Sequence, residues 1–479
     1  MQQLGCSRLI AILFLLILTG CSASTAFLPY PAKIAPLQQQ LSRATPPEDF
    51  TKIFKSERRS HDQILYNMEH GRLAQLFGKT EMSRADFATA IAGVRSNDER
   101  ALISARQIGA NLASFAINDK SLPYSGEGYE RVLLHHYQGF NYLLQGDLSG
   151  AGVELRWANL EQQEALNRHE KELAKAEQEG RAERIDDPAQ NSDYQRRYAQ
   201  LDELAGRVKN SFQNAYSFYL SGLVYELQGE ENDAYIDYKR ALEIYPENSY
   251  LQEDVLRLAR RLRMDDDLAE LAKRFPALYN LKSVADAGGE GELILFYEDG
   301  FVPPREETKI AFFLPPGVAV SFALPYYRGP WRHEDPLEVL AGGEVLGRTE
   351  MLCDVRGLAV KSLQERMPII LTRQVIRLAG KILAQHAAKE RFGPLGELGM
   401  MAYTIMSENA DLRSWLTLPE NVQMLRLRFP AGKQQLRLHS LGGVGGADLD
   451  LDVKAGGITI VHAVKSGEQF HSAVISFAK

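Results

Sequence analysis

The strongest constraint on this chain is a 34-residue pattern of small and aromatic residues over residues 215–248. Counted from Ala215, positions 8, 11, 15, 20, 24, 27 and 32 are occupied by Gly222, Tyr225, Gly229, Ala234, Tyr238, Ala241 and Pro246. Small residues let the two helices of a hairpin approach closely, and tyrosines fill the space between them. A proline then ends the second helix. The pattern therefore predicts a helical hairpin.

The spacing resembles the tetratricopeptide repeat, from which Ser221 departs at position 7. Two weaker windows begin at Ile64 and Val132 and carry small or aromatic residues at several of the same positions. These are Gly71, Gly78, Ser83, Phe87 and Ala90 in the first window, and Gly139, Tyr142, Gly146, Ala151, Leu155 and Ala158 in the second. The weaker windows support the full match because all three fall in one half of the chain.

An all-α, tetratricopeptide-like array is therefore expected over residues 56–280. Stacked hairpins of this kind form an extended concave surface, which suits a peptide or protein partner. Tyr142, Tyr225 and Tyr238 are the candidate partner-binding residues of this array. The alternative is an unrelated helix bundle in which the small residues recur by chance.

A long charged segment separates the second and third windows. Residues 159–185 are dense in Glu, Lys, Arg, Gln and Ala, which predicts one solvated helix. Residues 186–188 contain a proline that ends it, and residues 194–208 predict a return helix. The pair is expected to project as an antiparallel hairpin. Its role is either partner contact or that of a solvated strut.

The pattern changes to period two beyond a glycine-rich, linker-like stretch at residues 285–291. Apolar and polar residues then alternate in short segments separated by Gly and Pro turns, as expected of strands with one buried face. These segments are residues 292–297, 309–313, 318–324, 423–429, 434–439, 448–454 and 458–464. They predict an antiparallel β-sandwich within an α+β domain that spans residues 285–479.

A helical insertion interrupts these strands. Its helix-like segments are residues 358–365, 368–390 and 395–406. Arg373, Arg377 and Lys381 stand four residues apart on one helix face, where like charges repel. An anionic neighbour is therefore expected. It is either a set of Asp and Glu side chains from this chain, or a lipid head group, a glycan or a protein partner.

The N-terminus predicts a targeting segment. In residues 1–20 a single charge, Arg8, precedes an apolar run that suits a signal peptide and is too short to span a bilayer. The run ends in Leu18-Thr19-Gly20-Cys21, which resembles a bacterial lipobox. The resemblance implies cleavage before Cys21 and acylation of its thiol and its new amine, which anchors the chain in a membrane. Ser22 favours the outer membrane; an ordinary secretory signal with a coincidental cysteine is the alternative.

The segment after the lipobox is expected to be a tether. Residues 21–55 are rich in Pro, Ser, Thr and Gln, so we expect them to be partly ordered at best. Cys6 leaves with the signal peptide and lipid blocks Cys21, so Cys353 is expected to be the one free thiol. No intramolecular disulfide is then possible, and stability in an oxidising compartment must come from packing.

Composition and motifs exclude several function classes. A net charge of −7 gives no basic face for nucleic acid. No nucleotide-binding loop, zinc-protease motif or serine-hydrolase motif occurs, so we expect no cofactor, no metal and no catalytic residue. His135 and His136 diverge by about 100° on a helix, which favours core or hydrogen-bonded histidines over metal ligands. Cys353 has no local feature of a nucleophile.

The most distinctive segment of the C-terminal half is Ala-Asp-Leu-Arg-Ser-Trp-Leu-Thr-Leu-Pro at residues 410–419. In extended backbone Asp411, Arg413 and Trp415 share one face. A bidentate Asp–Arg pair with Trp alongside forms either a clamp that holds the helices to the sandwich or a binding site. The aromatic and basic loop around Trp331 is either a packed loop or a grip for a glycan or a partner.

Two blocks of the sequence resemble a family of bacterial lipoproteins with tetratricopeptide-like repeats. They are residues 410–419, with the pattern Ala-Asp-x-Arg-Ser-Trp, and residues 124–130, Tyr-Ser-Gly-Glu-Gly-Tyr-Glu. The resemblance covers most of residues 50–440 and implies a location in the cell envelope. In this family the genes often lie beside a lipoprotein activator of peptidoglycan synthases. The family supplies no catalytic residues to carry over.

These observations together predict a lipoprotein of the outer membrane that faces the periplasm. We expect it to act as a non-catalytic scaffold for envelope proteins, with peptidoglycan assembly as one process that it could serve. A glycan- or lipid-binding protein that uses Trp331 and the face of Arg373, Arg377 and Lys381 is a second hypothesis. A third is an enzyme whose site lies in the C-terminal half, which requires Asp411, Arg413 and His333 to meet in a cleft.

Overall fold

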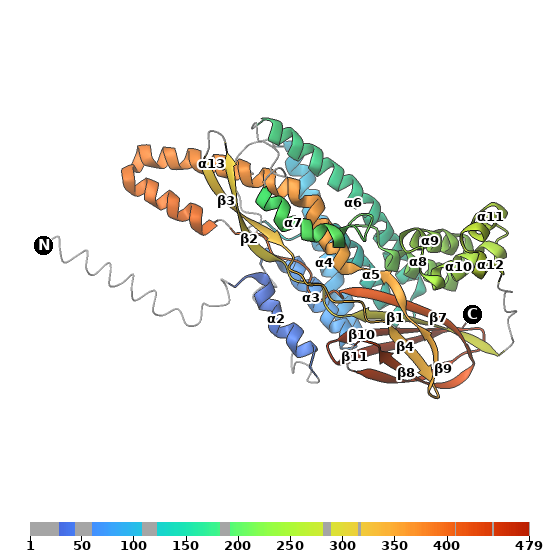
Figure 1. Ribbon diagram of the computed structural model, residues 1–479. Helices are drawn as coiled ribbons and strands as arrows, with labels where there is room; N and C mark the ends of the chain where they lie inside the picture. The colour runs from blue at the N-terminus through green and yellow to red at the C-terminus, as the bar shows by residue number, and fades with distance from the viewer. Residues whose placement is uncertain are drawn as a thin grey trace.

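The chain divides into a helical first half and a second half built mainly of strands (Figure 1). This computed structural model describes residues 28–43, 60–107, 122–182, 192–280, 289–314, 318–407, 409–442 and 445–478. The predicted signal peptide, Cys21 and most of the predicted linker lie outside these residues. Within the described part, no helix combines the length and the apolar character that crossing a membrane requires.

The helices of the first half follow one another as hairpins. They are α2 (Tyr30–Leu41), α3 (Gln63–Leu76), α4 (Thr80–Gln107), α5 (Gly128–Leu144), α6 (Leu148–Ala182), α7 (Ser192–Ala205), α8 (Ala215–Gln228), α9 (Glu231–Ile244), α10 (Ser249–Arg261), α11 (Asp265–Arg274) and α12 (Pro276–Asn280). The three sequence windows coincide with the packed pairs α3–α4, α5–α6 and α8–α9. Successive pairs also pack on one another, α4 against α5 and α6 against α8.

A glycine in each pair lets the two helices approach. A Cβ atom added to Gly71 would lie 2.6 Å from ring carbons of Phe87, and one added to Gly222 would lie 2.8 Å from the ring of Tyr238. The Cβ of a residue replacing Gly139 would lie 3.1 Å from Leu155. In all three windows these residues stand at positions 8 and 24. The same sequence spacing therefore produces an equivalent close contact in each helix pair.

Substituting Gly71 tests this contact. We expect Gly71→Ala to lower the free energy of unfolding by about 1–3 kcal/mol, because the new methyl group overlaps the buried ring of Phe87. Gly380→Ala is the matched control, since nothing lies within 4 Å of the added carbon there. It should stabilise its helix by up to about 1 kcal/mol. Chemical denaturation measures both, and equal effects would contradict the close-contact explanation.

The long charged helix is present, but its predicted hairpin is not. α6 continues through residues 148–182, as the sequence predicted. α7 does not project with it as a free hairpin, because α13 (Val355–Ser407) packs against both helices. Tyr198, Leu201 and Leu204 of α7 are buried, and a hairpin projecting into water would expose them. The helical insertion of the second half therefore belongs to the helical layer (Figure 1).

The second half contains more strands than the sequence predicted. They are β1 (Glu290–Asp299), β2 (Glu306–Leu314), β3 (Val318–Tyr326), β4 (Leu337–Ala341), β5 (Glu344–Arg348), β6 (Glu350–Cys353), β7 (Asn421–Pro430), β8 (Gly432–Ser440), β9 (Gly446–Val453), β10 (Ile458–Ser466) and β11 (Gln469–Phe477). One sheet has the order β11-β10-β1-β7-β6, a second has the order β5-β4-β8-β9, and β2 and β3 form a separate two-stranded ribbon. β4, β5, β6 and β11 were missed because they are short or carry weak alternation.

The prediction of a purely antiparallel sandwich was wrong in one pair. β1 runs parallel to β10, with Leu293 opposite Thr459, while β1 and β7 are antiparallel. Alternation in a sequence specifies which side chains are buried and contains no information on the direction of the neighbouring strand. β10 reaches β1 from the other sheet, after β9, so no hairpin turn forces it to run antiparallel.

The five-stranded sheet is buried on both faces. Leu293, Leu295 and Tyr297 of β1 pack with the four-stranded sheet in one hydrophobic cluster. Ile294 and Phe296, which point the other way, pack with the helices in a larger cluster that includes residues of both halves. The molecule therefore has three layers, helices, sheet and sheet, and the inner surface of the helical array faces a sheet of the same chain (Figure 1).

The predicted tether contains a docked helix. The hydroxyl of Tyr30, in α2, donates to Glu69 at 3.1 Å, and the side-chain amide of Gln38 donates to the carbonyl of Leu416 at 2.8 Å. The hydroxyl of Ser466 donates to the carbonyl of Leu41 at 2.7 Å. The proline content of this segment did not prevent a helix: Pro31 lies in the first turn, where its missing N–H matters least, and Pro36 lies inside the helix.

Candidate functional site

The inner surface of the helical array is occupied by residues 409–420, which we name the clamp segment. Two helix carboxylates bind its backbone. Glu69 of α3 accepts the N–H of Leu416 at 2.7 Å, the N–H of Thr417 at 3.0 Å and the hydroxyl of Thr417 at 2.5 Å. Glu130 of α5 accepts the N–H of Trp415 at 2.8 Å. An extended segment from the second half of the chain therefore packs against α3 and α5.

Trp415 anchors this segment. Its indole ring is fully buried and packs edge-on against Phe87 at 5.8 Å and Tyr137 at 5.9 Å between ring centres. Its indole N–H donates to the hydroxyl of Thr417 at 3.0 Å. The ring thus joins α4, α5 and the clamp segment in one core.

Arg413 supplies the charged part of the clamp. Its guanidinium binds Asp411 in a bidentate manner, at 2.9 and 2.7 Å, as the sequence predicted. It also donates to Asp62 at 2.6 Å and to the carbonyl of Leu122 at 3.0 Å. Burial alone would lower the pKa of Arg413, but these carboxylates keep the group charged. The arrangement matches the structural clamp of the two interpretations that the sequence left open.

A second carboxylate cluster joins the array to β1. Glu298 is fully buried and forms an ion pair with Arg72 of α3. Its oxygens also contact Nε2 of His462 at 2.9 Å and accept the hydroxyls of Tyr137 at 3.1 Å and Tyr216 at 3.3 Å. Burial favours the neutral acid, yet the charge of Arg72 and the contact with His462 outweigh it and lower the pKa of Glu298 to about 2.

Glu127 holds the insertion helix to the array. It lies just before α5 and accepts from Arg305 at 2.9 Å, from Arg366 of α13 and from the hydroxyl of Ser362 at 3.3 Å. Burial would raise the pKa of Glu127, but Arg366 and Arg305 lower it to about 2. This carboxylate therefore stays charged. It connects the start of α5 with Arg305 and with Ser362 and Arg366 of α13.

Glu69 differs from these two acids because no cation is among the groups that bind it. Burial raises the pKa of Glu69 to about 7, against the opposing effect of hydrogen bonds from Thr417, Leu416 and Tyr30. Its folded-state pKa thus lies above the ordinary value of 4.5. The folded state binds the proton more tightly than the unfolded state, so this contribution to stability is complete below about pH 4.5 and is lost as the pH rises through 7.

Glu69 should therefore make a contribution to the unfolding free energy that decreases between pH 5 and pH 8. We expect this contribution to be on the order of 3 kcal/mol and to be absent from Glu69→Gln, so the difference between the two proteins separates it from His136, whose lowered pKa acts in the opposite direction. Urea denaturation at each pH measures it. Glu298, whose pKa is lowered to about 2, acts in a separate window, because its contribution is lost as the pH falls from about 4.5 towards 2. A profile unchanged by Glu69→Gln would contradict the assignment.

The candidate partner-binding residues from the sequence do not share one surface. Tyr238 and Trp415 are fully buried, and Arg413, Arg377 and Lys381 are buried with little exposed area. Tyr142, Tyr225, Trp331, Arg373 and Asp411 are half-buried. Tyr238 donates to Glu226 at 3.0 Å, and the guanidinium of Arg356 lies 5.9 Å from the ring of Trp331. The accessible members are thus scattered over different elements.

The histidines and the free cysteine have roles within the fold. Nδ1 of His135 lies 2.7 Å from Glu154, and Nδ1 of His136 lies 3.3 Å from the hydroxyl of Ser217. Burial lowers the pKa of His136 to about 3, so it is neutral. Cys353 is buried, and burial raises its thiol pKa. Among the residues that the structure describes, no cluster of His, Cys, Asp and Glu could hold a metal ion.

The cluster that an enzyme would need is not assembled in the described residues. His333 is exposed on the connection between β3 and β4 and makes no hydrogen bond there to Asp411 or Arg413. Arg413 is turned inward, towards Asp62 and the carbonyl of Leu122. Asp411 and Arg413 therefore meet as predicted, and His333 does not join them.

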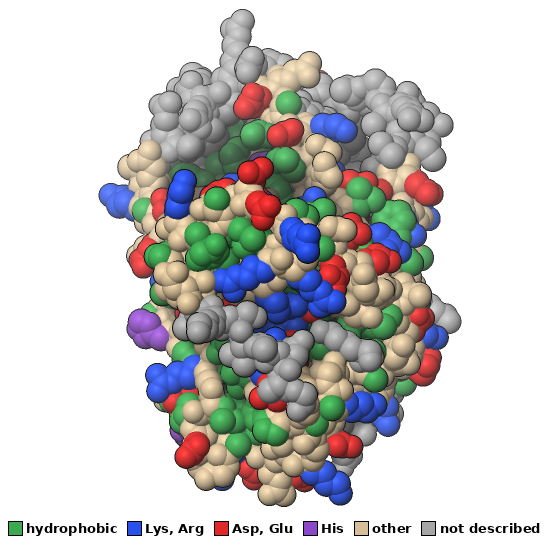
Figure 2. All heavy atoms as spheres, turned by 90° about the vertical axis from the view of Figure 1, so that its right-hand side faces the viewer, with side chains coloured by type: hydrophobic (Ala, Val, Ile, Leu, Met, Phe, Trp, Pro, Cys, Tyr) green, Lys and Arg blue, Asp and Glu red, His purple; other side chains and the backbone are tan. Residues whose placement is uncertain are grey.

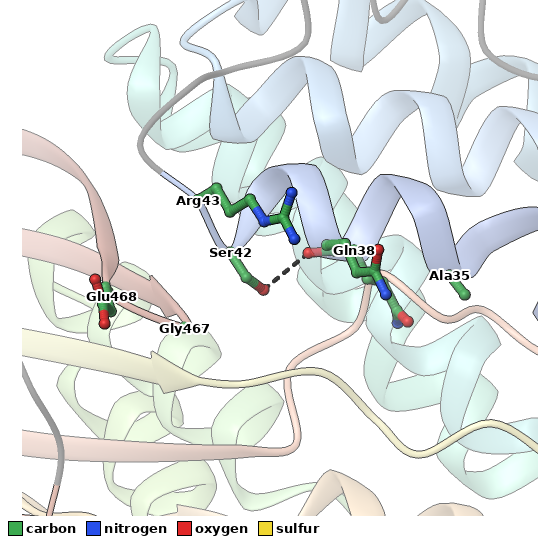
Figure 3. Close-up of a pocket in the computed structure, with 7 residues that line it drawn as sticks. Ala35, Gln38, Ser42, Arg43, Gly467 and Glu468 are labelled. Carbon is green, nitrogen blue, oxygen red and sulfur yellow. Dashed lines mark hydrogen bonds between the residues drawn. The ribbon is translucent and has the colours of Figure 1, made fainter.

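Two hollows lie on the outer surface instead. One, of about 630 Å³, lies between α2 and the β10–β11 turn, and Figure 3 shows Gln38, Ser42 and Arg43 on one side with Glu468 on the other. This hollow is open to solvent. The other, of about 440 Å³, lies between α9 and α11 beside Tyr235. Neither hollow includes the clamp segment.

The buried acids Glu69, Glu127, Glu130 and Glu298 were missed by sequence reasoning. Their signal is a lone acid within an otherwise apolar helix or strand face, such as Glu298 among the apolar residues of β1. Only their partners, which lie far away in the sequence, distinguish them from solvated acids. With this geometry in place, comparisons with known proteins add nothing: no family model, no curated protein and no solved structure matches the chain.

Proposed function

We propose that this chain is a lipid-anchored scaffold of the bacterial outer membrane, without catalytic activity, that holds envelope proteins together. Its helical half is a tetratricopeptide-like array. Three equivalent contacts, between Gly71 and Phe87, between Gly139 and Leu155 and between Gly222 and Tyr238, support the repeat assignment. The Leu18-Thr19-Gly20-Cys21 sequence supports the anchor.

The occupation of the inner groove by the clamp segment carries this proposal. Glu69 and Glu130, which could do acid–base chemistry in an open site, bind backbone N–H groups of the chain and are fully buried. Charged groups gathered in this way hold segments in place, as a rigid scaffold requires. With its inner surface filled, the array has to offer its outer surface to partners.

That outer surface carries apolar side chains at helical spacing. Val153, Trp157 and Leu160 of α6 are exposed, and their separations of four and three residues place them on one face. Ile236, beside the hollow between α9 and α11, is 47% exposed. Exposed apolar side chains gathered on one surface favour contact with another protein.

Photo-crosslinking in intact cells tests the scaffold. A photoreactive residue in place of Trp157 or Ile236 should capture the same envelope proteins in repeated experiments. Gln195 is the matched control, because it is exposed on α7, away from the apolar face of α6. Capture of no envelope protein, or equal capture at residue 195, would overturn the proposal.

The anchor is tested separately. Cys21→Ser should abolish incorporation of labelled palmitate and release the chain from the membrane fraction. Ser22→Asp should keep the lipid and move the chain to the inner membrane. A chain that remains in the outer membrane fraction after Cys21→Ser would refute lipid anchoring.

A further inference from the structure

We propose that the face around the start of α2 lies against the lipid bilayer, so that the body is held in one orientation on the membrane. The face is defined by Leu28, Leu122 and the projecting ribbon β2–β3, and its occupant is the bilayer surface. This inference rests on the proposed lipid at Cys21. It goes further by assigning which side of the folded body meets the membrane.

The length of chain between lipid and body limits the orientation. Leu28, the first described residue, is seven residues after Cys21. Seven residues span at most about 25 Å when fully extended. A compact body of this size has a radius of gyration of about 22 Å, so its far side is more distant from Leu28 than the tether can reach. The side that bears Leu28 must therefore stay near the membrane.

The start of α2 is fastened to the body rather than swinging from it. Tyr30 donates to the buried carboxylate of Glu69, and Ile34 and Leu37 are buried beneath the helix. The far end of α2 is held by Ser466, which donates to the carbonyl of Leu41. These contacts fix α2 to the folded body. The lipid near the start of α2 therefore limits where the body can lie.

The surface next to this point exposes two leucines. Leu28 is 41% and Leu122 is 43% exposed. They belong to one neighbourhood, because both regions border the clamp segment: Arg413 donates to the carbonyl of Leu122, and Tyr30 donates to Glu69, which also accepts the N–H of Leu416. Single exposed leucines are common, but two beside a lipid attachment point favour a membrane contact.

The ribbon β2–β3 projects on the same side. It pairs with no strand of the other two sheets, and Glu307, near its base, accepts the N–H of Ala410 at 2.9 Å, in the clamp segment. Figure 1 shows the labels of β2 and β3, the far end of α13 and the start of α2 in the left-hand part of the molecule. Beyond Lys309, the described exposed residues of the ribbon, Ala311 and Ser321, carry no charge. That part of the ribbon suits an apolar boundary better than a charged surface would.

The opposite side has the composition of a solvated surface. Figure 2 faces the side that bears α10, α11 and the sheet ends, and it shows Lys, Arg, Asp and Glu side chains interspersed with hydrophobic ones. Charged side chains of both signs are spread over that side, as on a surface in contact with water.

Environment-sensitive fluorescence tests the orientation in the lipidated, full-length chain. Single cysteines replace Leu28, Leu122 or Ser321, which is exposed on β3, and are labelled with a nitrobenzoxadiazole probe. Cys353 is buried and Cys21 carries the lipid, so neither takes the label. Leu346→Cys is the matched control, since Leu346 is an exposed leucine on the four-stranded sheet. The protein is reconstituted into vesicles of phosphatidylethanolamine and phosphatidylglycerol.

We expect a several-fold rise in emission with a blue shift for probes at residues 28, 122 and 321, and quenching by spin-labelled lipid. The probe at residue 346 should not change. Vesicle-bound protein whose three test probes behave like that control would overturn the orientation and leave the lipid anchor intact. Protein that stays in solution would overturn the anchor, and with it the inference. Probes that respond only when envelope proteins are added would overturn it in favour of a protein occupant.

Discussion

Replacing Glu298 with alanine should lower the free energy of unfolding by about 3–5 kcal/mol, because it leaves a buried charge on Arg72 without its partner. The same change removes the acceptor for His462, Tyr137 and Tyr216. Because these groups belong to α3, α5, α8 and β10, the loss affects the junction of the two halves. Chemical denaturation followed by circular dichroism measures the effect.

An exposed ion pair provides the control for Glu298. Asp193 and Arg196 of α7 pair on the surface, with most of both side chains in water. Asp193→Ala should change the free energy of unfolding by no more than about 1 kcal/mol. If the two alanine variants lose equal stability, the buried cluster does not join the halves as described.

Replacing Trp415 with alanine should remove about 3–5 kcal/mol of stability, because the ring is fully buried and leaves a cavity between Phe87 and Tyr137. The backbone N–H groups of Leu416 and Thr417 should also exchange hydrogen faster, since the side chain that holds the clamp segment beside Glu69 is gone. Denaturation and hydrogen exchange measure the two effects.

Trp157 is the matched control for Trp415. It is 39% exposed on α6, so Trp157→Ala should cost about 1 kcal/mol or less. It should also leave the exchange of Leu416 and Thr417 unchanged. A Trp415→Ala variant with the stability of the control would mean that the clamp segment does not secure the groove.

The helical half was the part best predicted from sequence. Its hairpins need a small residue at one position and a large one at another, and Gly222 and Tyr238 satisfy that local demand. Such a spacing is visible in one chain because both partners belong to the same short window. The long-range partners of α7 were not predictable, since the helix that covers it lies in the other half of the sequence.

The candidate site was predicted only where its partners are close in sequence. Asp411 and Arg413 are two residues apart, and their bidentate pair formed as expected. Glu69 and Thr417 are 348 residues apart, and nothing in the sequence around either residue predicts that the two will bind each other. The sequence therefore predicted the Asp411–Arg413 pair, but not the helices, α3 and α5, against which the clamp segment packs.

Local physics explains what the sequence by itself determined: the repeating helix contacts and the change to strands near residue 290. The membrane anchor that the lipobox-like residues 18–21 indicate stays a prediction. Each depends on residues within a few tens of positions of one another. The tertiary structure alone decided that β10 runs parallel to β1, that α13 joins the helices, and that residues 409–420 pack against α3 and α5. Those outcomes depend on which surfaces from distant parts of the sequence bury one another. The free energy of that burial depends on both partners, so no single segment of the sequence predicts it.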